Sequence, residues 1–324
     1  MKKNYTFLIV ALTLSSGANA QSPAQNLMPD GSHDMYLGLG VMSRPIYEGA
    51  EQSKRVVIPV MQMQWSNGIF LAGMSAGWHL SSQYKHEFGP LLSVEPSRTS
   101  SGVSNSILFP VSFPGSSGLG GNGSLTGDRA SEDVIPNKSG NKLADLEKIR
   151  TRFLYGGFYN YQITSHLRQT NTLLFGAGNN QRGIRLSSDL RYQFKDVLPH
   201  HHFTIGLGLT AVNRPYADTY FGVNKSTLHS QVVFLDVLSS DQARTTTQSP
   251  SSQLPLSGVA HQSFNPRAGI KDVHADFFWN WSLSSSWLVT SKISVSQLVG
   301  SSSKSPIVER KTNVTVSSAI AYRF

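Results

Sequence analysis

The sequence has no cysteine among its 324 residues. This absence excludes disulfide bonds, thiolate metal sites, cysteine nucleophiles and a lipid anchor on cysteine. It suits an exported bacterial chain that crosses an oxidising periplasm. Beyond its N-terminus, the sequence also lacks any segment with the length and apolarity of a transmembrane helix, and its mean hydropathy is −0.20. A helical membrane protein is therefore excluded, whereas a barrel with polar inward residues is not.

Clustered basic charge is absent as well. The formal net charge is +9, but Lys and Arg are scattered and no run of five of them occurs. We therefore expect no nucleic-acid partner. Polyanionic surroundings such as lipopolysaccharide or peptidoglycan agree better with this charge.

The N-terminus has the pattern of an export signal. Lys2 and Lys3 precede an uncharged run over residues 5–14, and the segment closes on Ala18-Asn19-Ala20, a small-x-small cleavage pattern. The apolar run is about half of the roughly 20 residues that a membrane-spanning helix needs. We expect residues 1–20 to be a cleaved signal peptide and residues 21–324 to form one domain. The alternative is a short buried helix.

The C-terminal segment alternates between two kinds of side chain. One face carries Val314, Val316, Ile320, Tyr322 and Phe324, with Ser318 as the one interruption, and the other carries Asn313, Thr315, Ser317, Ala319, Ala321 and Arg323. Side chains of a strand point alternately to its two faces. A closing strand that ends in Tyr-x-Phe is typical of outer-membrane β-barrels. Tyr322 and Phe324 are therefore predicted to be the signal that the barrel-assembly machinery reads.

Similar alternation recurs along the chain. It gives eleven candidate strands: 35–42, 54–65, 69–80, 89–97, 150–162, 166–177, 184–194, 203–210, 272–281, 287–296 and 313–324. Single-chain bacterial barrels have an even number of strands, so one candidate is wrong or one strand is missing, with Ser230 to Leu238 as the replacement. The phase slips in 54–80. The sequence predicts an all-β, antiparallel up-and-down barrel of 10–12 strands, with twelve favoured, and no helix of useful length after the signal.

The connections alternate between short and long. Short turns are expected at 65–68, at Thr164-Ser165 and at 199–202, and long polar loops near 98–148 and 213–265. Barrels of the outer membrane have short periplasmic turns and long outer loops. Aromatic residues at strand ends fit interfacial girdles: Trp65, Trp78, Tyr155, Tyr161, Tyr192, Trp279, Trp281 and Trp287. A soluble β-sandwich, with those rings in its core, is the alternative.

Four short motifs have residue types that occur in catalytic or binding sites. Gly118–Gly123 satisfies G-x-G-x-x-G, but no apolar strand precedes it and no helix follows. Ser301–Lys304 satisfies S-x-x-K without the further motifs of penicillin-recognising enzymes. The triplet His200–His202 is read as a polar turn instead of a metal site. His274, between Asp272 and Asp276, has no partnered serine and is read as part of a structural network. We expect no catalytic, cofactor or metal site.

Charged residues fall on the predicted lumen face. They are Arg185, Asp189, Arg191, Asp272, Asp276, Lys292 and Arg323. They form either an ion-pair network that fills a narrow barrel or the lining of a selective pore. A barrel of 10–12 strands is intermediate between filled eight-stranded barrels and open porins, so the sequence leaves both interpretations open.

Several segments resemble one known family. They are Gly38-Leu-Gly-Val-x-x-Arg-Pro-x-Tyr47-Glu48-Gly49, Thr219-Tyr220-Phe221-Gly222-Val223, Ala268–Asp272, Trp287, Ser305-Pro306-Ile307-Val308 and Ala321–Phe324. In this order they resemble the MipA/OmpV family of outer-membrane proteins, also called MltA-interacting proteins, over nearly the whole mature chain. The sequence departs from the family in its two long loops: 98–148 lacks the usual acidic run and 224–262 is extended.

The resemblance implies an outer-membrane barrel without established catalytic residues. It also implies a scaffold that joins a murein hydrolase, the lytic transglycosylase, to a murein synthase. Other members are treated as porin-like proteins or adhesins, so a small-solute channel or surface adhesin is the alternative. An outer-membrane lipid-modifying enzyme is a third hypothesis, for which no constellation of residues argues.

Overall fold

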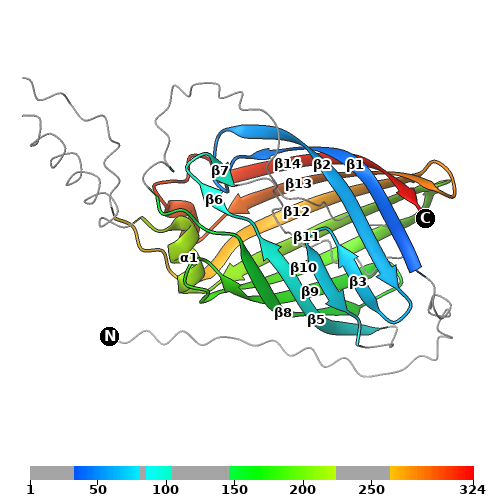
Figure 1. The fold of residues 1–324 in the computed structure, drawn as a ribbon, viewed down its shortest axis with the longest axis horizontal. Coiled ribbons are helices and arrows are strands. Elements are labelled where there is room, and N and C mark those ends of the chain that lie inside the picture. The colour runs from blue at the N-terminus through cyan, green and yellow to red at the C-terminus, as the bar shows by residue number, and fades with distance from the viewer. Residues whose placement is uncertain (1–32, 81–84, 104–142, 144–145, 224–262) are drawn as a thin grey trace, which may run out of the picture.

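The computed structural model describes residues 33–80, 85–103, 143, 146–223 and 263–324. Its main feature is a closed antiparallel barrel of twelve strands in the order β1-β14-β13-β12-β11-β10-β9-β8-β5-β4-β3-β2 (Figure 1). The predicted fold class and the favoured strand number are confirmed. The strands are β1 (His33–Pro45), β2 (Ser53–Trp65), β3 (Ile69–Ala72), β4 (Ser75–Trp78), β5 (His86–Glu95), β8 (Arg152–Gln162), β9 (Leu167–Ala177), β10 (Gly183–Leu198), β11 (His201–Val212), β12 (Gly269–Ser282), β13 (Trp287–Leu298) and β14 (Thr312–Arg323).

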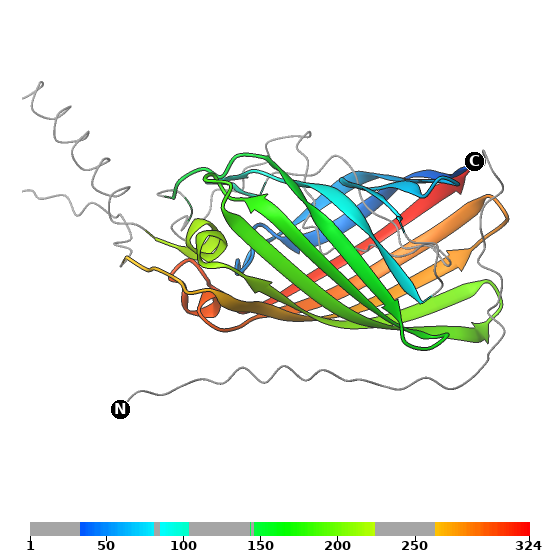
Figure 2. The same ribbon diagram turned by 90° about the horizontal axis from the view of Figure 1, so that it is seen from below.

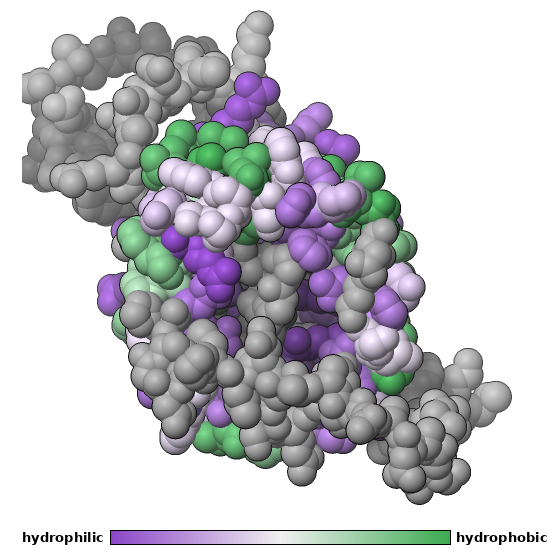
Figure 3. All heavy atoms as spheres, turned by 90° about the vertical axis from the view of Figure 1, so that its right-hand side faces the viewer, coloured by the Kyte–Doolittle hydropathy of each residue, from purple (hydrophilic) through white to green (hydrophobic). Residues whose placement is uncertain are grey.

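Alternation along the strands makes one apolar and one mostly polar face. On β14, Val316 and Ile320 are exposed on the outer wall, whereas Ala319 and Ala321 are buried inside. Figure 3, viewed from the end at which β14 finishes, shows hydrophobic side chains around the perimeter and hydrophilic ones nearer the opening. The predicted phase of β14 is therefore confirmed. Lipid-facing and lumen-facing residues alternate in this way in membrane barrels.

The inside of the barrel has two different sides. The inward residues of β3, β5 and β8 form an apolar cluster that includes Phe70, Leu91, Leu154 and Phe158. The inward residues of β10, β12 and β13 are largely polar or charged, and Asp189, Asp272 and Asp276 are all buried there. Barrels of this width are filled in part by their own side chains.

The single strand predicted over 69–80 is wrong, because this segment forms two strands. A turn at Gly73 and Met74 separates β3 from β4, and Gly73 has a positive φ of 57°. Four residues in each strand are too few to show alternation, so the phase appeared to slip. All of β2 pairs with β1 on one side. On its other side, among the described residues, β2 pairs with β3 only over Gln62–Gln64.

The sequence predicted no helix of useful length after the signal, and the structure has one short α-helix there. Helix α1 (Arg214–Phe221) directly follows β11. The Asn213 side chain accepts a hydrogen bond from the Tyr216 N–H, and Pro215 occupies the first turn. Both are standard features of a helix N-terminus. The helix is two turns long, which is too short to give a periodic signal in the sequence. No segment in the described ranges is a helix long and apolar enough to cross a membrane.

The two ends of the barrel differ. Figures 1 and 2 place α1 at the end opposite to the C-terminus. Also at the α1 end lie the short pair β6 (Arg98–Thr99) and β7 (Gly102–Val103) and the 3-10 helix η1 (Ser302–Lys304). We call this the outer end, because outer-membrane barrels carry their longer connections outside and their short turns in the periplasm. The opposite end is called the periplasmic end.

The short turns predicted at 65–68 and at Thr164-Ser165 are confirmed, and both lie at the periplasmic end. The third prediction, a turn over 199–202, is wrong in part. Only Pro199 and His200 connect the strands, because β11 begins at His201. The His201 ring stacks on Trp279 and Trp281, and its Nδ1 accepts a hydrogen bond from Trp279 Nε1. The backbone of His201 also pairs with Trp281 of β12, so the strand includes this histidine. Ser230 to Leu238, the suggested replacement strand, lies outside the described residues.

Candidate binding site at the outer end of the barrel

A cavity of about 200 Å³ lies inside the barrel near α1. Its described lining comes from β1, β5, β10 to β14 and α1, and from the segments that follow β1 and β5. We call it the outer cavity. It lies among side chains of both signs and several aromatic rings, and the apolar cluster adjoins it through Tyr216 and Phe221.

The motif Tyr47-Glu48-Gly49 forms one edge of the outer cavity. The Tyr47 hydroxyl donates to the Ile307 carbonyl at 3.0 Å, and Glu48 Oε1 lies 2.6 Å from Lys271 Nζ. The Gly49 N–H donates to Asn313 Oδ1 at 2.9 Å. Gly49 has a φ of 94°, which L side chains rarely adopt. This motif is therefore tied to β12 and β14, more than 220 positions away in the sequence.

The second motif, Thr219-Tyr220-Phe221-Gly222, forms the last turn of α1. The Arg98 guanidinium donates to the carbonyls of Thr219 and Tyr220, and the Ser305 hydroxyl donates to the Phe221 carbonyl at 2.6 Å. The Gly222 N–H donates to the Asp218 carbonyl. The partial negative charge at a helix C-terminus favours a cation there. Arg98 and the motif Ser305-Pro306 therefore fasten α1 to the barrel mouth, with Pro306 half-buried beside Ser305.

Burial sets the protonation of the groups around α1. Burial lowers the pKa of Arg98 to about 10, which still leaves the guanidinium charged at neutral pH. Burial also raises the pKa of Tyr216 to about 12, and it raises the pKa of Tyr220. The two tyrosine rings stack with centroids 4.4 Å apart. Arg98 and Lys271 each lie 5.9 Å from one of these ring centroids. Both hydroxyls therefore remain hydrogen-bond donors next to fixed positive charge.

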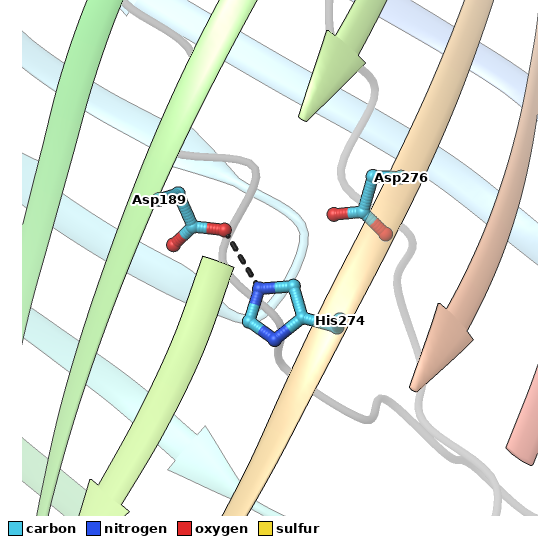
Figure 4. Close-up of side chains that lie close together, drawn as sticks. All are labelled: Asp189, His274 and Asp276. Atoms are coloured by element: carbon cyan, nitrogen blue, oxygen red, sulfur yellow. Dashed lines mark hydrogen bonds and ion pairs between the residues drawn. The ribbon is translucent and has the colours of Figure 1, made fainter. Parts of the chain in front are cut away.

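A buried charge network extends below the outer cavity. His274 Nε2 lies 2.9 Å from Asp189 Oδ1 (Figure 4). The other ring nitrogen, Nδ1, lies 3.0 Å from Asp272 Oδ1. Lys271 Nζ lies 3.1 Å from Asp272 Oδ2. The sequence predicted His274 between Asp272 and Asp276, whereas the structure joins it to Asp272 and to Asp189 of β10. His274 is therefore part of a structural network, as predicted, but its second partner is Asp189 of β10 instead of Asp276.

Asp189, His274 and Asp276 lie close enough together to hold a metal ion, with ligand atoms within 4.8 Å of one another. The cluster already contains a cation, because Lys292 Nζ is 3.4 Å from Asp276 Oδ1. Both nitrogens of His274 also have carboxylate partners. The two oxygens of Asp276 have no hydrogen-bond partner among the described residues. Because His274 is fully engaged and Lys292 already places a cation in the cluster, we assign no metal to it.

The other lumen charges have partners in different places. Arg185 pairs with Glu95 at 3.0 Å at the edge of the outer cavity. Arg191 lies over the Phe278 ring. Arg323 has the predicted lumen phase, but it is half exposed and pairs with Asp34 at the periplasmic end. Arg323 is the last residue of β14, where the lumen face meets solvent.

The remaining predicted residues do not join the outer cavity. The Tyr322 and Phe324 rings contact each other at the periplasmic end, and the Phe324 N–H donates to the Met35 carbonyl. Ser301 accepts a hydrogen bond from the Arg267 N–H beside the single turn of η1. Gly118–Gly123 lies outside the described residues.

Sequence reasoning missed Arg98, Tyr216 and Asn313 as residues of this site. Arg98 and Tyr216 were assigned to featureless loops. The pair Asn213 and Pro215 was the available signal for a helix start. Asn313 was placed correctly on the lumen face, but only the register of β14 brings it to Gly49.

The family model described as MltA-interacting protein MipA matches residues 37–324. No curated protein matches the sequence. Similar solved structures include the NanC porin, with 8% identity and a TM-score of 0.38 over 89% of this chain and 100% of the porin. The outer-membrane channel DcaP of Acinetobacter baumannii has 7% identity and a TM-score of 0.34, over 90% of this chain and 97% of DcaP. Neisserial surface protein A has 7% identity and a TM-score of 0.25, over 90% of this chain and 97% of that protein.

Proposed function

This chain belongs to the MipA family of MltA-interacting proteins, and we propose that it is a non-enzymatic scaffold of the outer membrane that docks peptidoglycan-remodelling enzymes. The partners would be a murein hydrolase of the lytic transglycosylase class, a murein synthase, or both. The family description, which names an interaction, carries this proposal. Outer-membrane lipid and lipopolysaccharide would surround the barrel wall.

The periplasmic turns are the surface that such enzymes would reach. Asn67, Thr164, Ser165 and His200 are exposed there. Each turn is held by short local contacts. The Thr164 hydroxyl accepts the Leu167 N–H, and the Asn67 side chain accepts the Ile69 N–H. Exchanging the sequence of one turn should therefore leave the strands paired.

Affinity capture from solubilised envelopes tests the scaffold. Variants with exchanged turns at Asn67-Gly68, Thr164-Ser165 and Pro199-His200 are compared with deletions within 104–142 and 224–262, which spare Arg98 and α1. Each variant is first shown to be folded by heat-modifiable mobility. We expect the turn exchanges to abolish capture of the cell-wall enzymes and the deletions to leave it intact. Capture that survives every turn exchange but is lost with a loop would refute docking at the periplasmic end.

A small-solute channel is the second candidate, and the outer cavity is the observation that favours it. A cavity inside the lumen, lined by charged and polar side chains, is a feature that solute passage uses. Planar-bilayer recordings test this candidate, and a conducting barrel that captures no enzyme would replace the scaffold proposal. The purified protein should show no hydrolase activity in lipid-hydrolysis and murein-hydrolysis assays under either proposal. A surface adhesin remains an alternative without a specific structural observation.

A further inference from the structure

We infer that the outer cavity is a binding site for a small hydroxylated anion, a sugar-like molecule that carries a carboxylate or a phosphate group. This inference concerns ligand binding by the barrel itself. It depends neither on enzyme docking at the periplasmic turns nor on conduction through the lumen.

The charge of the lining is the first argument. Five cationic side chains from Lys and Arg line the outer cavity, against three from Asp and Glu: Arg44, Arg98, Arg185, Lys271 and Lys292 against Glu48, Glu95 and Asp272. All five cationic residues are largely buried, and hydrogen bonds fix Arg98. Arg185, Lys271 and Lys292 are ion-paired, the last with Asp276 outside the lining, so the excess over the acidic groups is one cation when Asp276 is counted. Fixed positive charge in a site with restricted water attracts anions more strongly than the same charge at an open surface.

Two buried donors provide the second argument. Asn313 is 7% exposed, and its Nδ2 has no hydrogen-bond partner among the described residues, although its Oδ1 accepts the Gly49 N–H. The Tyr220 hydroxyl is likewise buried without a partner there. Leaving a buried donor unsatisfied costs about 1–3 kcal/mol. Both residues line the outer cavity, so an acceptor-rich ligand would satisfy donors that the protein leaves open.

The rest of the lining defines the body of the ligand. Hydroxyl groups from four strands line the cavity: Ser187, Thr210, Ser294, Ser296, Thr315 and Ser317. Serine and threonine hydroxyls both donate and accept, as the hydroxyls of a sugar do. The rings of Tyr216, Tyr220 and Phe278 add apolar surface to the same lining. A hydroxylated ring that bears an anionic group matches these three kinds of neighbour.

The test uses three probes with the purified, folded full chain in detergent. D-glucuronate carries a carboxylate, glucose 6-phosphate carries a phosphate, and D-glucose is the neutral reference. Isothermal titration calorimetry at low ionic strength should show at least one anion binding roughly tenfold or more tightly than glucose, because charge-assisted hydrogen bonds are about twice as strong as neutral ones. The anion that binds more tightly identifies the preferred charged group.

Two nearly isosteric variants locate the site. Asn313→Asp keeps the acceptor for Gly49 but removes the Nδ2 donor and adds a negative charge, so anion affinity should fall roughly tenfold. Tyr220→Phe removes only the hydroxyl and should weaken binding severalfold without loss of stability, since that oxygen has no partner to lose among the described residues. The matched controls are Asn67→Asp in a periplasmic turn and Tyr155→Phe on the outer wall, and both should bind as the wild type does.

Three results would overturn the inference: glucose binding as tightly as the anions, no binding of either anion, or Asn313→Asp with unchanged affinity. Because the titration measures the isolated barrel, these results stand apart from the capture and bilayer experiments. Failure of anion binding would leave the scaffold proposal intact, and failure of enzyme capture would leave the binding site intact.

Discussion

At the scale of single residues, the two faces of each strand carry opposite chemical requirements. Leu207 is 61% exposed on the outer wall, whereas Ser187 lines the outer cavity. Arg at Leu207 should lower the free energy of unfolding by roughly 2–4 kcal/mol if it lies near the bilayer midplane, because hydrocarbon cannot solvate the charge. Arg at Ser187 should cost less. Refolding titrations in lipid vesicles measure both, and the reverse order would show that the faces are inverted.

Leu186 and Phe277 share this outward phase and should behave as Leu207 does. Gly208 is also on the lumen face, but it would not tolerate a larger side chain as Ser187 should. A Cβ atom there would lie 2.4 Å from His274 Nε2 and 2.8 Å from Asp189 Oδ1. The glycine makes room for the buried His274–Asp189 contact, so even alanine should disturb that network. Lumen phase alone therefore does not identify a tolerant residue.

At the scale of elements, helix α1 depends on tertiary contacts. Eight residues are too few for an isolated helix to be stable in water. Arg98 supplies two donors to its last carbonyls. Arg98→Gln should therefore loosen α1 and raise amide hydrogen exchange over residues 214–221. The control is Arg214→Ala, whose exposed pair with Asp218 contributes little. Equal exchange in both variants would show that Arg98 does not anchor the helix.

Strand β14 closes the barrel and ends in an exposed aromatic residue. Its pairing with β1 and β13 is continuous, and Phe324 contacts Tyr322 on the outer wall. Deleting Phe324, or replacing it with Asp, should reduce the amount of folded protein in the outer membrane, since the assembly machinery is predicted to read this strand. Heat-modifiable mobility of membrane fractions measures the folded amount. Wild-type levels in both variants would argue against the signal.

Long alternating segments were the elements that the sequence predicted best. The strands over β10 to β14 have ten or more residues each, and a period of two is unambiguous at that length. The errors fell on short elements, where fewer residues share one face. β3 and β4 merged into one predicted strand, and α1 disappeared into a loop. The site depends on just such short elements, so it was predicted less completely than the barrel.

At the scale of the whole molecule, three of the segments that carry the family resemblance, Tyr47–Gly49, Thr219–Val223 and Ser305–Val308, gather at the outer end, whereas Trp287 and Tyr322 pair at the periplasmic end. Tyr47, Glu48 and Gly49 are tied to the neighbourhood of Ile307, Lys271 and Asn313 across more than 220 positions. No spacing in the sequence indicates such contacts, since strand register and barrel closure create them. The proposed docking turns lie at the opposite end. The two proposals therefore require two surfaces that face different compartments.

The absence of cysteine makes this orientation directly measurable. Lys304 is exposed at the outer end and Asn67 is exposed in a periplasmic turn. In intact cells, a membrane-impermeant maleimide should label Lys304→Cys but not Asn67→Cys, because the outer membrane shields the periplasm. Permeabilising that membrane should make both variants reactive, while the cysteine-free parent stays unlabelled throughout. Labelling of Asn67→Cys alone in intact cells would invert the barrel. The outer cavity would then face the periplasm, and the proposed docking turns would be out of reach of any cell-wall enzyme.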